Sequence, residues 1–254
     1  MMLRKIGKVV LVLLVLGAAV LAAWYQIDGQ PLPEARQYLE GGGYTTQVED
    51  DGVMVFTPAV ANGHGLLIMH GALIKPLSYA KTAAYFARLG YTVFVPSGAA
   101  RLSITAVDSA AARLASFDVR DWVLIGHSMG GFSSLELISR HAPPVKALAL
   151  WACAMPGDYS SLSLPMLFIR GDQDGLLPPE RFADAQSKLP ATVEYVNLPG
   201  GNHRGFALYS HQFFDGEATM SPDEQVDFAN EKTAAFFAAH FQSKATQGGS
   251  NEQQ

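Results

Sequence analysis

Short apolar runs alternate with longer segments of mixed polarity from residue 65 to residue 241. Runs that are apolar at every position are typical of strands buried on both faces, as in a parallel sheet covered by helices on both sides. The predicted strands are residues 66–69, 91–95, 122–125, 145–151, 166–169 and 193–196. The predicted helices are residues 77–89, 104–117, 130–141, 179–189 and 222–241. This alternation predicts a doubly wound α/β fold with a mostly parallel sheet.

The sheet is expected to begin with an antiparallel hairpin, after a short helix at 34–39. Residues 45–49 and 53–57 flank Asp50-Asp51-Gly52, which is a hairpin signal. The predicted domain covers residues 44–242, between a linker at 26–43 and a polar, disordered tail at 243–254. Only residues 152–165 separate two of the predicted strands, which leaves no room for an inserted lid domain. We therefore expect an open site, unless the segment 97–103 or 209–220 folds over it.

An apolar segment at residues 1–25 differs from the rest of the chain. Arg4, Lys5 and Lys8 precede an uninterrupted apolar run that ends in Trp24-Tyr25. Its length, its basic flank and its terminal aromatic pair favour a single membrane anchor whose basic end stays in the cytoplasm. A cleaved secretory signal has the same layout, with Ala22 or Ala23 at the cleavage site. Both interpretations place the domain outside the cytoplasm, at a cell membrane or, if cleaved, in the periplasm or medium.

Composition excludes several classes of function. The chain of 254 residues is 49% hydrophobic and 16% charged, and its formal net charge of −5 argues against a nucleic-acid partner. The single cysteine, Cys153, rules out an intramolecular disulfide and is expected to be a small buried hydrophobic residue. Nothing in the composition indicates the oligomeric state.

The sequence Gly126-His127-Ser128-Met129-Gly130-Gly131 stands between a predicted strand and a predicted helix. It matches the G-x-S-x-G nucleophile elbow, in which a strained strand-to-helix turn exposes a serine hydroxyl and the glycines allow strand and helix to approach closely. Ser128 is therefore the predicted nucleophile.

A serine nucleophile needs a neutral imidazole as base and a carboxylate that orients it. Asp174 and His203 follow the strands 166–169 and 193–196, in the serine, acid, histidine order of this architecture. Asp172 is a rival acid, nearer the end of its strand, with a turn hydrogen bond as its alternative role. His211 is a candidate for lining the pocket.

The predicted oxyanion hole consists of two backbone amides. Met129 follows the nucleophile at the start of its helix, where the helix dipole favours negative charge. The second donor is expected from the loop after strand 66–69, with Ala72 as first choice and Leu73 as second. No metal or organic cofactor is needed for this chemistry.

Together these motifs resemble the α/β-hydrolase superfamily, and within it the lid-less, often membrane-anchored bacterial group called the alpha/beta hydrolase fold-5 family. The resemblance spans about 44–242 and is most specific at Gly200-Gly201-Asn202-His203, followed by Gly205-Phe206, Tyr209, Gln212 and Asp215-Gly216. It implies a triad of Ser128, Asp174 and His203. Related members often carry a Pro-Gly-Gly oxyanion loop where this chain has His70-Gly71-Ala72.

The expected function is a serine hydrolase of esterase type that forms an acyl-enzyme on a small ester, thioester or amide. A peptidase or an acyltransferase would use the same three residues. A non-catalytic binding protein of the cell envelope, with the elbow kept only as structure, is an alternative of a different class.

Overall fold

The computed structural model describes residues 2–242, so the predicted tail at 243–254 lies outside the described residues. Its centre is one eight-stranded sheet in the order β1-β2-β4-β3-β5-β6-β7-β8. The strands are β1 (Tyr44–Val48), β2 (Met54–Pro58), β3 (His64–Met69), β4 (Thr92–Val95), β5 (Asp121–His127), β6 (Val145–Trp151), β7 (Met166–Gly171) and β8 (Glu194–Leu198). Strand β2 pairs antiparallel with β1 and β4, and all other pairs are parallel. The predicted sheet, entered through a hairpin, is confirmed.

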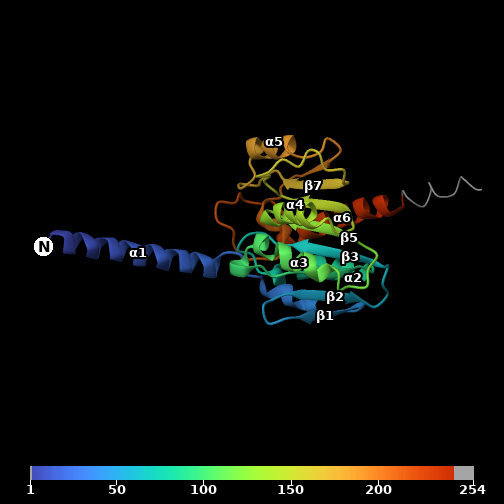
Figure 1. Cartoon of the computed structure of the whole chain (residues 1–254), viewed down its shortest axis with the longest axis horizontal. Helices are drawn as coiled ribbons and strands as arrows, with labels where there is room; N and C mark the ends of the chain where they lie inside the picture. Colours follow the sequence, from blue (N-terminus) through green and yellow to red (C-terminus); the bar gives the residue numbers. More distant parts are fainter. Residues whose placement is uncertain (1, 243–254) are drawn as a thin grey trace, which may run out of the picture.

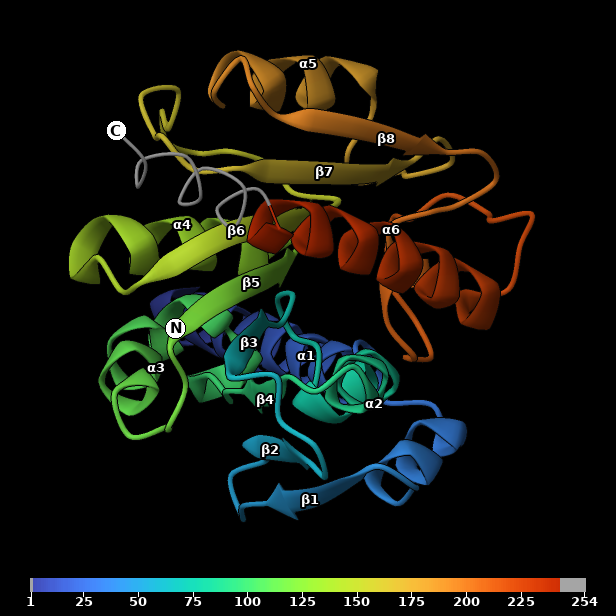
Figure 2. The same cartoon turned by 90° about the vertical axis from the view of Figure 1, so that its right-hand side faces the viewer.

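Alternate side chains of the central strands enter two separate cores. Val123 and Ile125 of β5 pack with helices α2 (Ala80–Arg88) and α6 (Pro222–Gln242). Leu124 of the same strand packs on the other face, among residues of α3 (Val107–Leu114), α4 (Met129–His141) and α5 (Pro179–Ser187). Figure 2 shows α2 and α6 on one side of the sheet and α3 and α4 on the other. Burial on both faces is why these strands lack polar alternation.

Two predicted helices begin differently from the prediction. Residues 77–89 and 104–117 each start with a 3₁₀ turn, at Pro76–Tyr79 and Ser103–Ala106, before α2 and α3. Proline suits a first helical turn because its missing N–H needs no intrahelical partner there. The segment predicted as a helix at 34–39 is a 3₁₀ helix, Pro33–Leu39. Between β6 and β7 the described chain contains no helix or strand, so no lid domain is inserted there.

Helix α1 (Met2–Ile27) leaves one end of the domain and extends away from it (Figure 1). Residues Val10–Ile27 form a window with mean hydropathy 2.3, none of which is buried by the rest of the protein. This window is long and apolar enough to cross a membrane, and a signal sequence would have the same properties. The segment after α1 lies against the domain: Leu32 donates a backbone hydrogen bond to Leu208 (2.9 Å), and Ala35 is buried.

Candidate active site

Ser128 occupies a strained turn between β5 and α4. Its φ and ψ of 54° and −121° lie in a region that residues other than glycine rarely adopt. The turn is held by a hydrogen bond from the Ser128 amide to the Trp151 carbonyl of 2.8 Å. A Cβ on Gly126 would come within 2.5 Å of the Gly130 carbonyl oxygen, so only glycine fits there. The elbow predicted from the sequence therefore has the expected backbone geometry.

The helix that follows the elbow packs tightly on the sheet. A Cβ on Gly131 would overlap the Sγ atom of Cys153, whose side chain is fully buried beneath α4. Burial raises the pKa of the Cys153 thiol, so it stays protonated near neutral pH. The cysteine is thus a small buried residue, as the sequence predicts.

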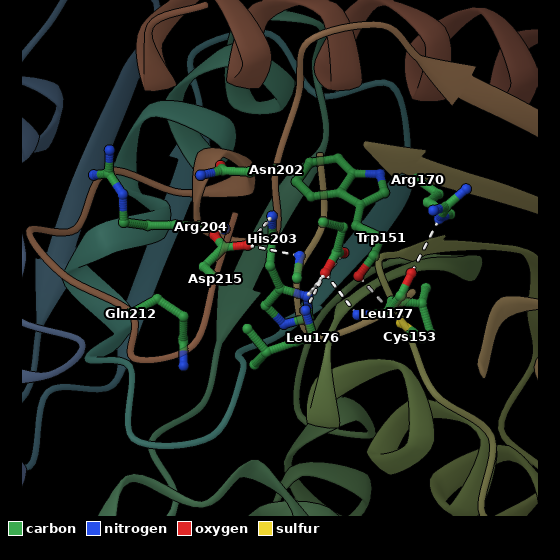
Figure 3. Close-up of polar contacts among 12 residues, drawn as sticks. Trp151, Cys153, Arg170, Leu176, Leu177, Asn202, His203, Arg204, Gln212 and Asp215 are labelled. Atoms are coloured by element: carbon green, nitrogen blue, oxygen red, sulfur yellow. Dashed lines mark hydrogen bonds and ion pairs between the residues drawn. The ribbon is translucent and has the colours of Figure 1, made fainter. Parts of the chain in front are cut away.

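Asp174 and His203 meet at the carboxyl ends of β7 and β8. Nδ1 of His203 lies 3.0 and 3.1 Å from the two Asp174 carboxylate oxygens, and both residues are buried. Oδ1 of Asp174 also accepts the amides of Leu176 (2.9 Å) and Leu177 (2.7 Å), which fix its orientation (Figure 3). The carboxylate therefore selects the imidazole tautomer that carries its proton on Nδ1.

The rival acid, Asp172, points elsewhere. Its Oδ1 accepts the Gly200 amide at 2.7 Å, and its side chain is exposed. This contact joins the turn after β7 to the turn after β8, which is the local structural role considered for Asp172. Of the two aspartates, Asp174 is the one whose carboxylate contacts His203.

Asp215 is a residue whose role the sequence analysis missed. Its Oδ1 accepts the backbone amides of His203 (3.1 Å) and Gly175 (3.2 Å), and its Oδ2 accepts that of Arg204 (2.7 Å). One carboxylate therefore binds the backbone next to both Asp174 and His203 (Figure 3). The only sequence signal was its place in the Asp215-Gly216 part of the family motif.

A buried chain of hydrogen bonds joins the loop after β3 to the loop that carries His203. The Gly71 amide donates to the Tyr79 hydroxyl oxygen at 2.9 Å, and this oxygen lies 2.7 Å from Nδ1 of His127. Nε2 of His127 lies 3.1 Å from the His203 carbonyl oxygen. Burial, and secondarily the nearby His203, lowers the pKa of His127, so its imidazole is neutral. The tautomer that satisfies every atom accepts from Tyr79 at Nδ1 and donates from Nε2.

The two candidate donors in the loop after β3 differ in their contacts. The Leu73 amide donates to the Arg101 carbonyl oxygen at 2.7 Å, so it is already engaged. Among the described residues, none accepts the Ala72 amide. Met129 is the first residue of α4, so its amide is free of the intrahelical hydrogen bonds. Ala72 and Met129 therefore remain available as donors.

Ser128 and His203 line one cavity of about 490 Å³. Much of its wall is apolar and comes from α4 and the segments after β6 and β7: Met129, Phe132, Ala154, Met155, Leu176 and Leu177. Arg181 and Asp184 of α5, and Lys188 directly after it, add charged groups to the lining. Neither Ala72, Leu73 nor His211 is among the lining residues. His211 lines a separate hollow, and its Nδ1 lies 3.1 Å from Oδ1 of Asp28.

Within residues 2–242, no group of three or more histidine, cysteine, aspartate or glutamate side chains has the arrangement of a metal site. A hydroxyl and a carboxylate-bound imidazole on one largely apolar cavity are groups that can carry out acid–base and nucleophilic chemistry.

Comparisons with known proteins agree with this architecture. The fold is shared by a predicted CIB-like hydrolase from Thermoplasma acidophilum, with a TM-score of 0.56 and 16% identity over 75% of this chain and 99% of that one. It is also shared by a ferulic acid esterase from Streptomyces cinnamoneus, with a TM-score of 0.58 and 16% identity over 74% of this chain and 82% of that one. A structure described for the metagenome-derived lipolytic enzymes LipS and LipT has a TM-score of 0.56 and 17% identity over 76% of this chain and 100% of that one. No curated protein is similar enough in sequence to count as a match. The model of the alpha/beta hydrolase family matches residues 65–227, which is more than half of the sequence. The predicted family resemblance is thereby confirmed, and the chain belongs to the alpha/beta hydrolase family.

Proposed function

We propose that this hydrolase is a serine esterase that works through an acyl-enzyme, with Ser128 as nucleophile, His203 as base and Asp174 as the orienting acid. The observation that carries the proposal is that a strained Ser128 and a His203 whose Nδ1 is bound to Asp174 line the same cavity. Because Nδ1 is occupied, Nε2 is the nitrogen left to serve the serine hydroxyl.

In this mechanism Ser128 Oγ attacks the acyl carbon while His203 Nε2 takes the hydroxyl proton. The carbonyl oxygen becomes an oxyanion, which the amides of Met129 and Ala72 stabilise. His203 then gives its proton to the leaving alcohol, and the acyl group remains on Ser128. A water molecule, activated by the same imidazole, hydrolyses the acyl-enzyme and restores the serine. His203 carries out both proton transfers, and Asp174 keeps its imidazole in the required tautomer and orientation.

The apolar wall formed by residues such as Phe132, Met155 and Leu177 suits the acyl part of a small ester, thioester or amide. A peptidase or an acyltransferase would use the same attack on an acyl carbon but a different leaving or accepting group. Parallel assays with acyl esters and aminoacyl amides distinguish these reactions.

The proposal includes a location. Helix α1 would anchor the protein in a cell membrane, with the domain at residues 44–242 on the extracytoplasmic side. A cleaved signal would instead release the same domain. Intact mass of the protein recovered from the membrane fraction distinguishes an anchored chain that retains α1 from a shortened, soluble one.

The proposed nucleophile is tested by labelling the full-length protein, in detergent, with a fluorophosphonate probe. We expect the probe to label the native protein and not to label the Ser128→Ala variant. Ser160→Ala, which removes an exposed serine between β6 and β7, is the matched control and should label like the native protein. A native protein that never labels, or an unchanged signal in Ser128→Ala, would favour the non-catalytic binding protein.

A further inference from the structure

The candidate active site and the membrane helix lie at the same edge of the sheet. Ser128, Asp174 and His203 follow the carboxyl ends of β5, β7 and β8. The chain just after α1 contacts the loops at the carboxyl ends of β3 and β8: the Lys75 amide donates to the Gly29 carbonyl at 3.1 Å, and the Gly29 amide donates to the His211 carbonyl at 3.2 Å. Parallel strands end at one common edge. The bilayer around α1 would therefore adjoin the edge that holds the reactive groups.

The end of α1 is fixed to this edge by several contacts. Trp24 donates from its indole nitrogen to Oδ2 of Asp28 (3.1 Å) and packs edge-on against Phe213, with ring centroids 5.4 Å apart. The Arg101 guanidinium lies 3.5 Å from the centroid of the Tyr25 ring and donates to the Tyr25 carbonyl. Arg101 belongs to the loop after β4 and Phe213 to the segment after β8, so two separate parts of the domain contact the end of α1. They hold the direction of α1 relative to the domain, so the domain cannot turn freely on its anchor.

The aromatic pair Trp24-Tyr25 marks the expected depth of the membrane surface, since tryptophan and tyrosine favour the boundary between lipid and water. The apolar window ends two residues later, at Ile27, and Gly29 already makes backbone hydrogen bonds to the domain. Figure 1 shows only a short stretch of coil between the end of α1 and the body of the protein. The carboxyl edge of the sheet would therefore rest on the surface of the bilayer.

Phe214 supports this orientation independently. Its side chain is 83% exposed and its φ is 66°, so a large apolar group is held in water by a backbone conformation that costs free energy. It lies beside the candidate site, because a Cβ on Gly175 would come within 2.6 Å of the Phe214 carbonyl oxygen, and Asp215 is its neighbour. An exposed aromatic residue beside the end of a membrane helix is well placed to enter the lipid surface.

We infer that the candidate active site opens toward the bilayer that α1 crosses, and that its substrate is an acyl ester carried by an amphiphile of that same bilayer. This inference rests on the proposed function. In the reaction the bond between acyl carbon and ester oxygen breaks, water supplies a hydroxyl to the acyl group and a proton to the alcohol, and a fatty acid and an alcohol are released. The largely apolar cavity next to Ser128 would receive part of the acyl chain.

The test uses the full-length protein in phosphatidylcholine vesicles. A long-chain palmitoyl ester is placed either in the vesicles that carry the protein or in separate vesicles without protein, and an acetyl ester dissolved in water reports basal activity. We expect hydrolysis of the palmitoyl ester at least about tenfold faster when it shares the vesicle with the protein, because the site would meet lipid of its own membrane at a much higher effective concentration.

Phe214→Asn removes the apolar ring while tolerating the positive φ. We expect the rate of palmitoyl ester hydrolysis in shared vesicles to fall about tenfold relative to the rate of acetyl ester hydrolysis. A tenfold change corresponds to the low end of the free energy gained by removing a phenylalanine side chain from water. Val60→Asn is the matched control: Val60 is 82% exposed, but it lies between β2 and β3, at the opposite edge of the sheet. Its ratio of palmitoyl to acetyl rate should equal that of the native protein.

Equal palmitoyl rates in shared and separate vesicles would overturn the inference, as would an equal effect of Phe214→Asn and Val60→Asn. If the acetyl ester is hydrolysed in those cases, the proposed function still stands. If the protein neither hydrolyses the acetyl ester nor labels at Ser128, the proposed function itself fails, and the inference fails with it.

Discussion

Replacing Tyr79 by phenylalanine tests whether the buried chain from Gly71 through His127 to His203 positions the candidate site. The substitution removes one oxygen atom from a fully buried ring. Two groups lose their partner: the Gly71 amide, at 2.9 Å from that oxygen, and Nδ1 of His127, at 2.7 Å. Water cannot readily replace the hydroxyl, because the site is closed to solvent.

Leaving a buried donor or acceptor unpaired costs about 1–3 kcal/mol, so two such groups give an expected loss in the free energy of unfolding of about 2–6 kcal/mol for Tyr79→Phe. Tyr209→Phe is the matched control. Tyr209 is equally buried, but its hydroxyl makes one hydrogen bond of 3.2 Å, to Gln212. We expect that control to lose about 1 kcal/mol. For a domain of this size these values correspond to falls in Tm of about 4–24 °C for Tyr79→Phe and about 2–4 °C for Tyr209→Phe.

The same substitution should lower activity in a way that plain destabilisation does not. Gly71 precedes Ala72, the proposed oxyanion donor, and His127 holds the backbone of His203. At a temperature where both variants are folded, we expect kcat for an acetyl ester to fall about 10- to 100-fold in Tyr79→Phe with KM nearly unchanged, as small misplacements of reacting groups do. The measurements are thermal unfolding of the full-length protein in detergent and steady-state kinetics below both transitions. A Tyr79→Phe variant that matches Tyr209→Phe in Tm and in kcat would refute the reasoning.

Two further predictions concern Asp174 and His70. Asp174→Asn should lower kcat for an acetyl ester about 10⁴-fold, because His203 loses the group that sets its tautomer. Asp172→Asn is the control and should keep a kcat near that of the native protein. Equal losses of kcat in the two variants would contradict the choice of Asp174 as the acid. Burial, opposed in part by a hydrogen bond to Gly71, lowers the pKa of His70 from 6.5 to about 4, so the folded protein binds fewer protons than the unfolded chain between these values. The contribution of neutral His70 to the free energy of unfolding is complete above pH 6.5, and about 3 kcal/mol of it is lost as the pH falls toward 4. His70→Gln should therefore flatten this part of a curve of unfolding free energy against pH. An unchanged slope would show that other groups dominate this part of the curve.

The sequence was sufficient for the features that depend on local pattern. Strand β5 was recognisable because Val123, Leu124 and Ile125 are all apolar, which follows from the two cores that receive their side chains in turn. The elbow was recognisable because only glycine fits at positions such as 126, where strand and helix nearly touch. Order along the chain then singled out Asp174 and His203, and those two side chains are in contact in the folded protein.

The residues that were missed act across long separations in the chain. Tyr79 and His127 are 48 positions apart, and Asp215 contacts the Gly175 amide 40 positions earlier. No local period or spacing marks such pairs, because the contact exists only after several strands have been laid side by side. A tyrosine between small and apolar residues, as at 79, is compatible with simple packing until its hydroxyl is seen between two polar partners. The direction of α1 likewise depends on Trp24, Tyr25 and their partners far along the chain.

The sealed thiol of Cys153 has a practical consequence. It is the chain's single cysteine, and the elbow helix covers it completely. Its burial and raised pKa keep it from reacting with maleimide dyes in the folded protein, so no cysteine-free background has to be prepared. An environment-sensitive fluorophore attached through Phe214→Cys would then report from one known position, and lipid-borne quenchers could measure how deeply that position enters a vesicle.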